Sequence, residues 1–240
     1  MTIPYKNSHS SKKQQVAHMF NSIAHSYDFL NRLLSLGIDK IWRKRAVRKL
    51  QKYNPTHILD IATGTGDFAI AIARKMPLSS VVGVDISENM LAKAEQKILK
   101  KRLAHQITVH VGDSENLQFS ETSFDAVTVA FGVRNFENFN RGLSEIYRVL
   151  KPNGVAVILE FSKPTQFPIK QLYFFYFKKI LPIIGTLFSK DMGAYTYLPE
   201  SVDVFPYGNA FVKHVTHAGF SKTMHFPLSF GIVSLYICEK

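Results

Sequence analysis

Residues 58–67 read Ile58-Leu59-Asp60-Ile61-Ala62-Thr63-Gly64-Thr65-Gly66-Asp67, a short β-like run that leads through a turn of small residues into a helix. Gly64 and Gly66 permit tight backbone geometry and the close approach of a ligand. The start of the following helix offers backbone N–H groups that have no partner within the helix. A strand, a glycine-containing turn and a helix in this order are typical of a nucleotide-binding α/β sheet.

Strands and helices alternate outward from this turn. We predict strands at 57–61, 80–85, 107–111, 124–131 and 155–161, and helices at 68–75, 88–102 and 141–149. Such alternation predicts an α/β fold with a parallel, doubly wound sheet. Two further β-like runs, at 223–228 and 232–238, predict a C-terminal antiparallel hairpin on the sheet edge. The Asn153-Gly154 pair before the fifth strand is typical of a turn.

Acidic residues follow two more of the predicted strands. Asp85 ends the second strand about 20 residues after the glycines, where a carboxylate can bind the ribose hydroxyls of a nucleotide. Asp113 follows the third strand, where an acid can bind an adenine amino group. Because ligands of such sheets lie at the carboxyl ends of the strands, we predict that both acids face one cofactor, together with Asp60, Gly64 and Gly66.

Two cofactors fit this arrangement. NAD suits the spacing, because Ala69 stands three residues after Gly66, where the dinucleotide fingerprint accepts alanine. Asp60 and Asp67 would, however, repel a pyrophosphate placed beside the turn. S-adenosylmethionine carries no phosphate and bears a sulfonium and an ammonium group, which acids attract. We therefore predict S-adenosylmethionine, with NAD as the alternative.

Composition excludes several classes of protein. The 240 residues are 46% hydrophobic and 20% charged, which predicts a folded α/β domain or two small ones rather than a disordered chain. No apolar run approaches the roughly 18 residues that cross a bilayer, and residues 1–18 lack the core of a secretion signal. The single Cys238 excludes a disulfide framework, and no histidine has a metal-ligand spacing. We expect a cytoplasmic protein without a metal.

Positive charge concentrates near the N-terminus. Of the net charge of +12, residues 1–53 carry +9, from 11 Lys/Arg and 2 Asp/Glu. We predict a flexible tail at 1–15 and an N-terminal helical lid at 16–53, interrupted at Gly37. Residues 54–240 would form the main domain. The basic face of the lid suits a solvated helix, or contact with nucleic acid, anionic lipid or an acidic partner.

Residues 163–198 interrupt the alternation with an apolar insertion. Its apolar and aromatic residues are Phe167, Tyr173, Phe174, Phe175, Tyr176, Phe177, Ile180, Leu181, Ile183, Ile184, Leu187 and Phe188. The segment is too apolar for an ordinary loop and too interrupted to span a membrane. It suits a core helix pair, a wall for an apolar ligand, a surface that dips into a membrane, or the contact of a homodimer.

Three stretches resemble class I S-adenosylmethionine-dependent methyltransferases, and among them the menaquinone/ubiquinone biosynthesis C-methyltransferases. They are Tyr27-Asp28-Phe29-Leu30-Asn31-Arg32-Leu33-Leu34-Ser35-Leu36-Gly37-Ile38-Asp39-Lys40-Ile41-Trp42, then Phe131-Gly132-Val133-Arg134-Asn135, and Arg148-Val149-Leu150-Lys151-Pro152-Asn153-Gly154 with Leu159-Glu160-Phe161-Ser162-Lys163-Pro164. The resemblance runs from about Val16 to the C-terminus. The chain departs from it at Leu30, Asp39 and Asn153, where the family usually has Met, His and Gly.

The resemblance implies a Rossmann-like fold and the roles of several residues. Thr65, Asp85, Asp113 and Ser114 would contact S-adenosylmethionine. Ala130 stands where some members have a cofactor-contacting Ser, and Ala62 replaces a frequent Gly. The implied reaction transfers a methyl group to a ring carbon of a polyprenyl quinol.

Methylation of carbon requires an acceptor made nucleophilic by loss of a phenolic proton. Arg134 follows the fourth predicted strand and is our first candidate to stabilise the phenolate or polarise a water. Tyr27, Asp28 and Asn31 lie within one helical turn and are candidates to face the acceptor ring together. No general base is evident.

Several alternatives remain open at this point. Demethylmenaquinol is the preferred acceptor, and 2-methoxy-6-polyprenyl-1,4-benzoquinol is the alternative. The net charge slightly favours RNA, but the aromatic insertion favours a lipidic acceptor, so no nucleic acid is expected. Another small-molecule methyltransferase, or a non-catalytic protein that keeps the fold, would share the same sheet. Because polyprenyl quinones reside in bilayers, the basic lid and the insertion suit peripheral contact with the inner face of a membrane.

Overall fold

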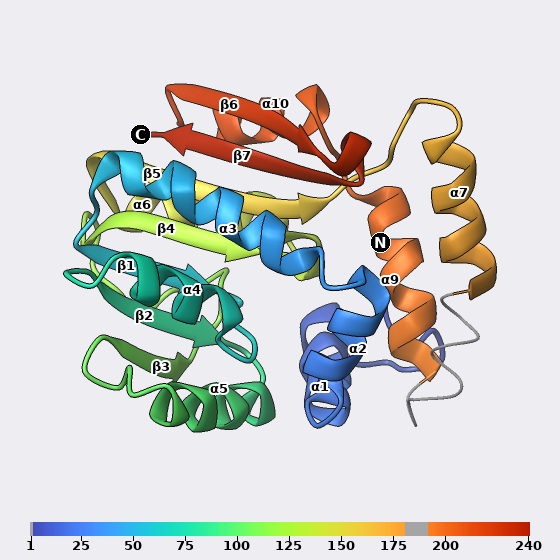
Figure 1. The fold of residues 1–240 in the computed structure, drawn as a ribbon, viewed down its shortest axis with the longest axis horizontal. Helices are drawn as coiled ribbons and strands as arrows, with labels where there is room; N and C mark the ends of the chain where they lie inside the picture. Colours follow the sequence, from blue (N-terminus) through green and yellow to red (C-terminus); the bar gives the residue numbers. More distant parts are fainter. Residues whose placement is uncertain (1, 181–191) are drawn as a thin grey trace.

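A seven-stranded sheet forms the centre of the computed structural model, which describes residues 2–180 and 192–240 (Figure 1). The strands are β1 (His57–Ile61), β2 (Ser80–Asp85), β3 (Ile107–Val111), β4 (Phe124–Ala130), β5 (Leu150–Phe161), β6 (Lys222–Leu228) and β7 (Val233–Glu239). Their order is β3-β2-β1-β4-β5-β7-β6. Strands β1 to β5 are parallel, and β7 runs antiparallel between β5 and β6. The predicted doubly wound sheet with a C-terminal antiparallel hairpin is confirmed.

Helices cover both faces of the sheet. One face carries α3 (Asp39–Leu50), α4 (Asp67–Lys75) and α5 (Glu88–Lys100), and the other carries α6 (Phe139–Val149) and α10 (Asn209–His217). Successive residues of a strand point to opposite faces, so Ile58 joins the cluster that holds Leu50 of α3, while Leu59 joins the one that holds Ile146 of α6. Both strand residues are fully buried. This alternation fixes the position of β1, and with it the turn that follows.

A third group of helices lies at the carboxyl ends of the parallel strands (Figure 1). It contains α1 (Lys12–Ile23), α2 (Tyr27–Ser35), α7 (Ile169–Phe175), the π-helical turn η3 (Tyr176–Ile180) and α9 (Met192–Val204). Leu36 and Gly37 adopt positive φ values of +51° and +75°, which ends α2 at the predicted interruption. Met19 of α1, Leu30 of α2 and Tyr197 of α9 share one buried cluster. These helices therefore cover the carboxyl ends of the parallel strands, where ligands of this fold bind.

Two local predictions were wrong. Helix α1 begins at Lys12 rather than after the predicted tail, because Ser11 and Gln14 form a capping box. The fifth strand begins at Leu150 rather than at 155, so the Asn153-Gly154 pair lies inside β5 and not before it. The register of the two strands shifts at this pair: Phe124 of β4 pairs with Leu150 and Ala126 with Val155, so residues 151–154 stand opposite Asp125, and Asn153 has a φ of +63°.

The structure describes part of the apolar insertion at 163–198. Its residues Leu181, Ile183, Ile184, Leu187 and Phe188 lie outside the described residues. The described part forms α7, η3 and the beginning of α9. Among the helices of the described chain, none combines the length and apolar character that crossing a bilayer requires.

Candidate active site

The turn after β1 is tied to the end of β2 by Asp85. Gly64 and Gly66 have φ values of +56° and +78°, which residues with a side chain adopt only at a cost. The Asp85 carboxylate accepts hydrogen bonds from the N–H groups of Gly64 at 2.8 Å and Ser87 at 2.9 Å. Burial raises the pKa of Asp85, and the backbone donors counteract part of that rise. A rigid, negatively charged rim therefore joins the two strand ends.

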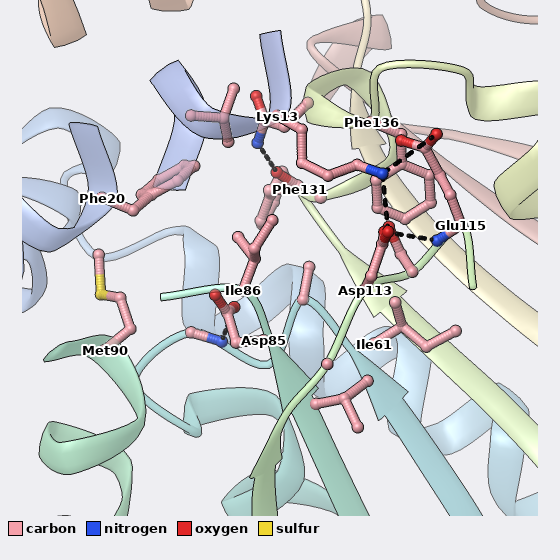
Figure 2. A pocket seen from close by; sticks show the side chains of 18 of the residues that line it. Lys13, Phe20, Ile61, Asp85, Ile86, Met90, Asp113, Glu115, Phe131 and Phe136 are labelled. Carbon is pink, nitrogen blue, oxygen red and sulfur yellow. Dashed lines mark hydrogen bonds and ion pairs between the residues drawn. The ribbon is translucent and has the colours of Figure 1, made fainter. Parts of the chain in front are cut away.

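A cavity opens above this rim, and Figure 2 shows the side chains that line it. Asp85 and Asp113 reach it from two strand ends, and Lys13 and Phe20 reach it from α1. The Lys13 ammonium lies 2.7 Å from one Asp113 oxygen, and the other oxygen accepts the N–H of Glu115 at 2.9 Å. Burial lowers the pKa of Lys13, but the Asp113 and Glu115 carboxylates outweigh burial and raise it overall. Helix α1 is thus pinned over the cavity.

The residues of this cavity fit S-adenosylmethionine. Asp85 keeps lone pairs free after its backbone hydrogen bonds, so it can also accept from two ribose hydroxyls. Around Gly64, a Cβ atom would meet no heavy atom within 4 Å, which leaves room for a ligand against the backbone. Ile86 and Met90 supply an apolar wall on the side away from Asp113 (Figure 2). Ser114 also lines the cavity.

Three predicted cofactor residues do not line this cavity. Asp60 lies beneath the turn, where it accepts hydrogen bonds from the hydroxyls of Thr63 at 2.6 Å and Thr128 at 2.5 Å. Burial raises the pKa of Asp60 to about 6, although both hydroxyls oppose the rise. Gly66 is the N-cap of α4, and Thr65 donates to Asp28 at 2.6 Å.

The electrostatic argument against NAD was wrong. Asp67 is paired with Lys97, and Asp60 is enclosed in the protein. Neither carboxylate lines the cavity. Repulsion of a pyrophosphate therefore gives no reason to prefer S-adenosylmethionine to NAD. That preference rests on the family comparison below.

A second, larger cavity of about 510 Å³ adjoins the first. Phe20, Tyr27, Phe131 and Asn135 line both cavities and so form the boundary between them. Most other lining residues are apolar and come from α1, α2, α3, α7 and α9. The helices that roof the sheet therefore enclose an apolar chamber beside the cofactor cavity.

Arg134 lies in this second cavity, on the short 3₁₀ turn η2 (Val133–Asn135) that follows β4. Its Nη1 donates to Glu160 at 2.8 Å and to the carbonyl of Phe131, and its guanidinium lies 5.3 Å from the centre of the Phe161 ring. Phe131 has a φ of +60°, a strained conformation for a bulky residue. The side chains of Arg134 and Glu160 are only 8% and 1% exposed. The buried Glu160 carboxylate thus orients a buried cation within the cavity.

The structure separates the three predicted residues of α2. Tyr27 and Asn31 line the larger cavity. Asp28 instead accepts from Lys97 at 2.7 Å and from Thr65. It lines neither cavity. Asp28 therefore joins the lid to the cofactor turn, while Tyr27 and Asn31 face the acceptor side.

Sequence reasoning missed several residues of the two cavities. Lys13 fell within the predicted tail, although the Ser11–Gln14 capping box signalled a helix start. Asn135 stands next to Arg134 in a stretch quoted above, yet it was given no role. Tyr197 carried no local signal, because only the packing of α9 brings it to the cavity.

Solved structures share this fold. A SAM-dependent methyltransferase from Aquifex aeolicus matches with a TM-score of 0.62 at 15% identity, over 88% of this chain and 97% of that one. The [4+2]-cyclase SpnF matches with a TM-score of 0.62 at 14% identity, over 96% and 97%. The fold is therefore that of the class I methyltransferases, which also carries other chemistry.

Sequence comparison identifies the family. Residues 8–240 match the model of the ubiE/COQ5 methyltransferase family, and the chain belongs to that family. A demethylmenaquinone methyltransferase of Bacteroides fragilis is 45% identical over 237 residues, 99% of this chain and 96% of that protein. A ubiquinone/menaquinone biosynthesis C-methyltransferase of Geotalea daltonii is 48% identical over 233 residues, 96% and 98% of the two chains. The chain is an S-adenosylmethionine-dependent C-methyltransferase of this type.

Proposed function

We propose that the chain methylates a ring carbon of a polyprenyl quinol, with demethylmenaquinol as the acceptor. One observation carries the proposal: an apolar cavity of about 510 Å³, with a buried arginine in it, adjoins the cavity of Asp85 and Asp113. A quinol ring with an isoprenoid tail has matching chemistry, since it is apolar except for two oxygens. The names of the relatives, demethylmenaquinone methyltransferase and ubiquinone/menaquinone biosynthesis C-methyltransferase, support the same acceptor class.

RNA suits the cavity poorly. Phosphate groups bind to accessible cations, whereas this cavity is walled by side chains such as Trp42, Phe161 and Phe177. An aromatic or lipidic acceptor is therefore preferred to a polyanion.

Arg134 is the group that we assign to activation of the acceptor. S-adenosylmethionine supplies an electrophilic methyl group when bound. A phenol becomes nucleophilic at its ring carbon once the hydroxyl proton leaves, and a nearby buried cation favours the phenolate. Arg134 supplies that cation, and Glu160 and Phe161 hold it in place. A water bound to the guanidinium would accept the proton, and Tyr27 and Asn31 would contact the ring.

The test is turnover with defined acceptors. The purified chain is mixed with methyl-labelled S-adenosylmethionine and either short-chain demethylmenaquinol, the 2-methoxy-6-polyprenyl-1,4-benzoquinol or RNA. We expect label in the naphthoquinol and at least about a 100-fold loss of kcat in Arg134→Ala. Arg74→Ala, which changes an exposed arginine of α4, is the matched control and should keep full activity. Label in the benzoquinol alone would change the acceptor, and label in RNA alone would overturn the proposal.

We also propose that the mouth of the apolar cavity docks on an anionic bilayer. Leu36, Leu172 and Phe230 line the cavity and are 80%, 61% and 74% exposed. Lys40 and Lys44 are exposed on α3, the helix that follows Leu36 in the chain. Apolar side chains beside basic ones complement a surface of acyl chains and anionic headgroups, where each cation contributes about 1 kcal/mol. A lipid substrate would then pass from the bilayer into the cavity without crossing water.

Vesicle sedimentation tests this docking. The chain should sediment with vesicles that contain phosphatidylglycerol at low ionic strength, and less so with phosphatidylcholine alone. Phe230→Ser and Lys44→Glu should weaken binding. Leu99→Ser and Lys93→Glu, which alter exposed residues of α5, should leave it unchanged. Failure to bind anionic vesicles at low salt would remove the proposal.

A further inference from the structure

Four buried polar atoms of the apolar cavity lack a hydrogen-bond partner. In the described part of the chain, buried side-chain atoms without a partner are Arg134 Nε, Asn135 Oδ1, Tyr173 OH, Tyr197 OH and Thr223 Oγ1. All but Thr223 belong to residues that line this cavity. Native proteins pair nearly all such atoms, so a cluster of exceptions in one cavity indicates a polar ligand there.

Other polar side chains of the cavity are paired with one another. Ser35 donates to Asp39 at 2.8 Å, and Ser229 accepts the indole N–H of Trp42 at 2.8 Å. These pairs need no ligand, which sets the four unpartnered atoms apart from them.

The two tyrosines are held firmly by their rings. Tyr173 is 7% exposed and lies against Phe177, with ring centres 4.2 Å apart. Tyr197 is 2% exposed and belongs to the cluster of Met19 and Leu30. Burial raises the pKa of both hydroxyls, that of Tyr197 to about 12, although the charge of Arg134 opposes the rise. Both hydroxyls therefore stay protonated near neutral pH and can donate hydrogen bonds.

The four atoms fall into two pairs by their place in the fold. Arg134 and Asn135 stand on η2 at the end of β4, and Asn135 also lines the cofactor cavity. Tyr173 and Tyr197 come from α7 and α9, which lie beyond the carboxyl ends of the parallel strands (Figure 1). A 1,4-quinol likewise has two oxygens, on opposite edges of its ring.

We propose that Tyr173 and Tyr197 form a donor pair for the quinol oxygen para to the hydroxyl beside Arg134. This inference rests on the proposed function. The pair fixes the ring in the plane and direction that bring the reacting carbon toward the cofactor cavity, and it selects aromatic acceptors with two para oxygens. An acceptor without the second oxygen would leave both hydroxyls buried and unpaired, which such sites reject.

Trp42 makes direct binding measurable. It is the single tryptophan of the chain and lines the cavity, so a bound naphthoquinone should quench its fluorescence. The probe is a short-chain demethylmenaquinone, whose oxygens accept the same hydrogen bonds. We expect Tyr173→Phe and Tyr197→Phe each to raise its Kd about fivefold to tenfold, because each removes one donor and keeps the ring. Tyr147→Phe, on the far face of the sheet beside Phe220, is the matched control and should not change Kd.

Turnover assays test the donor pair by changing the protein and the acceptor independently. The same variants are assayed with demethylmenaquinol and with the 1-naphthol analogue that lacks the para oxygen. The variants should lose kcat/KM on the quinol and nothing further on the analogue. An equal loss on both acceptors, or an unchanged Kd for the quinone, would overturn the donor pair while the proposed function stood. Absence of quinol methylation by the unmodified chain would instead overturn the proposed function.

Discussion

The Lys12 ammonium of α1 donates to the backbone carbonyls of Arg134 at 3.0 Å and Phe136 at 2.7 Å. It therefore caps η2, the turn that carries Arg134 into the apolar cavity. Burial lowers the pKa of Lys12 to about 8, and the charge of Arg134 acts in the same direction. Burial of a cation is costly unless the cation is hydrogen-bonded or paired, and both hydrogen bonds of this ammonium go to the turn of Arg134.

Replacement of this cation should reduce turnover more than binding. Lys12→Met leaves two buried carbonyls without a charged donor, so the Arg134 turn loosens, and we expect kcat to fall about tenfold with little change in KM. Lys12→Arg should recover part of the loss, and Lys93→Met, on exposed α5, is the control. The measurement is steady-state kinetics together with thermal unfolding. A lower Tm with unchanged kcat would assign Lys12 to stability alone.

Lys13 should control the release of ligands from the cofactor cavity. Its ion pair with Asp113 closes the roof of that cavity, and the two side chains are 31% and 30% exposed. Partly exposed pairs contribute only about 1 kcal/mol or less, so Lys13→Met should speed dissociation of S-adenosylhomocysteine by about twofold to fivefold. Stopped-flow displacement measures this rate, and added salt should speed release from the unmodified chain only. Slower release from the variant would contradict the closing role.

Much of the sheet could be predicted because its signals are local. The strand at residues 57–61 and the strand at 80–85 were predicted at their observed bounds, since short apolar runs and glycine turns mark both. Asp85 and Asp113 followed from their places at strand ends. The fold-level assignment therefore needed no knowledge of distant contacts.

The roof of the site could not be predicted in the same way. Tyr197 reaches the cavity through the packing of α9 against α1, which no spacing in the sequence encodes. Asp28 and Asn31 lie three residues apart on one helix and differ by only about 60° around its axis, yet Asp28 pairs with Lys97 while Asn31 lines the cavity. Asp60 precedes the glycine turn, but the alternation of β1 directs it to Thr128. The contacts that these side chains make depend on residues that are distant in the sequence and are brought together only by the fold.

Asp28 and Lys97 should behave as a coupled pair. Burial raises the pKa of Asp28, but Lys97 and Thr65 outweigh burial and lower it overall. Asp28→Asn and Lys97→Met should each reduce the free energy of unfolding by about 1 kcal/mol, and the double variant should lose less than the sum. Urea unfolding of the four proteins gives the coupling. A collapse of kcat in Asp28→Asn with normal cofactor affinity would instead make Asp28 a catalytic residue, as the sequence suggested.

Asp60 and Asp125 should give pH dependences of opposite sign. The folded-state pKa of Asp60 is raised by burial to about 6, above its ordinary value of about 4. Between these values the folded chain holds a proton that the unfolded chain has released, so ionised Asp60 costs stability above pH 6. Relative to Asp60→Asn, the unmodified chain should gain about 1 kcal/mol in its free energy of unfolding as pH falls from 7 to 5.

For Asp125, burial is outweighed by Lys151 and Thr56, and the pKa is lowered. Its contribution is present above about pH 4 and is lost as pH falls further, so the advantage of the unmodified chain over Asp125→Asn should shrink toward acid. Both differences come from urea unfolding across pH. Equal slopes for the two variants would mean that the buried Asp60 carboxylate is stabilised by its two hydroxyl donors as fully as Asp125 is by its lysine.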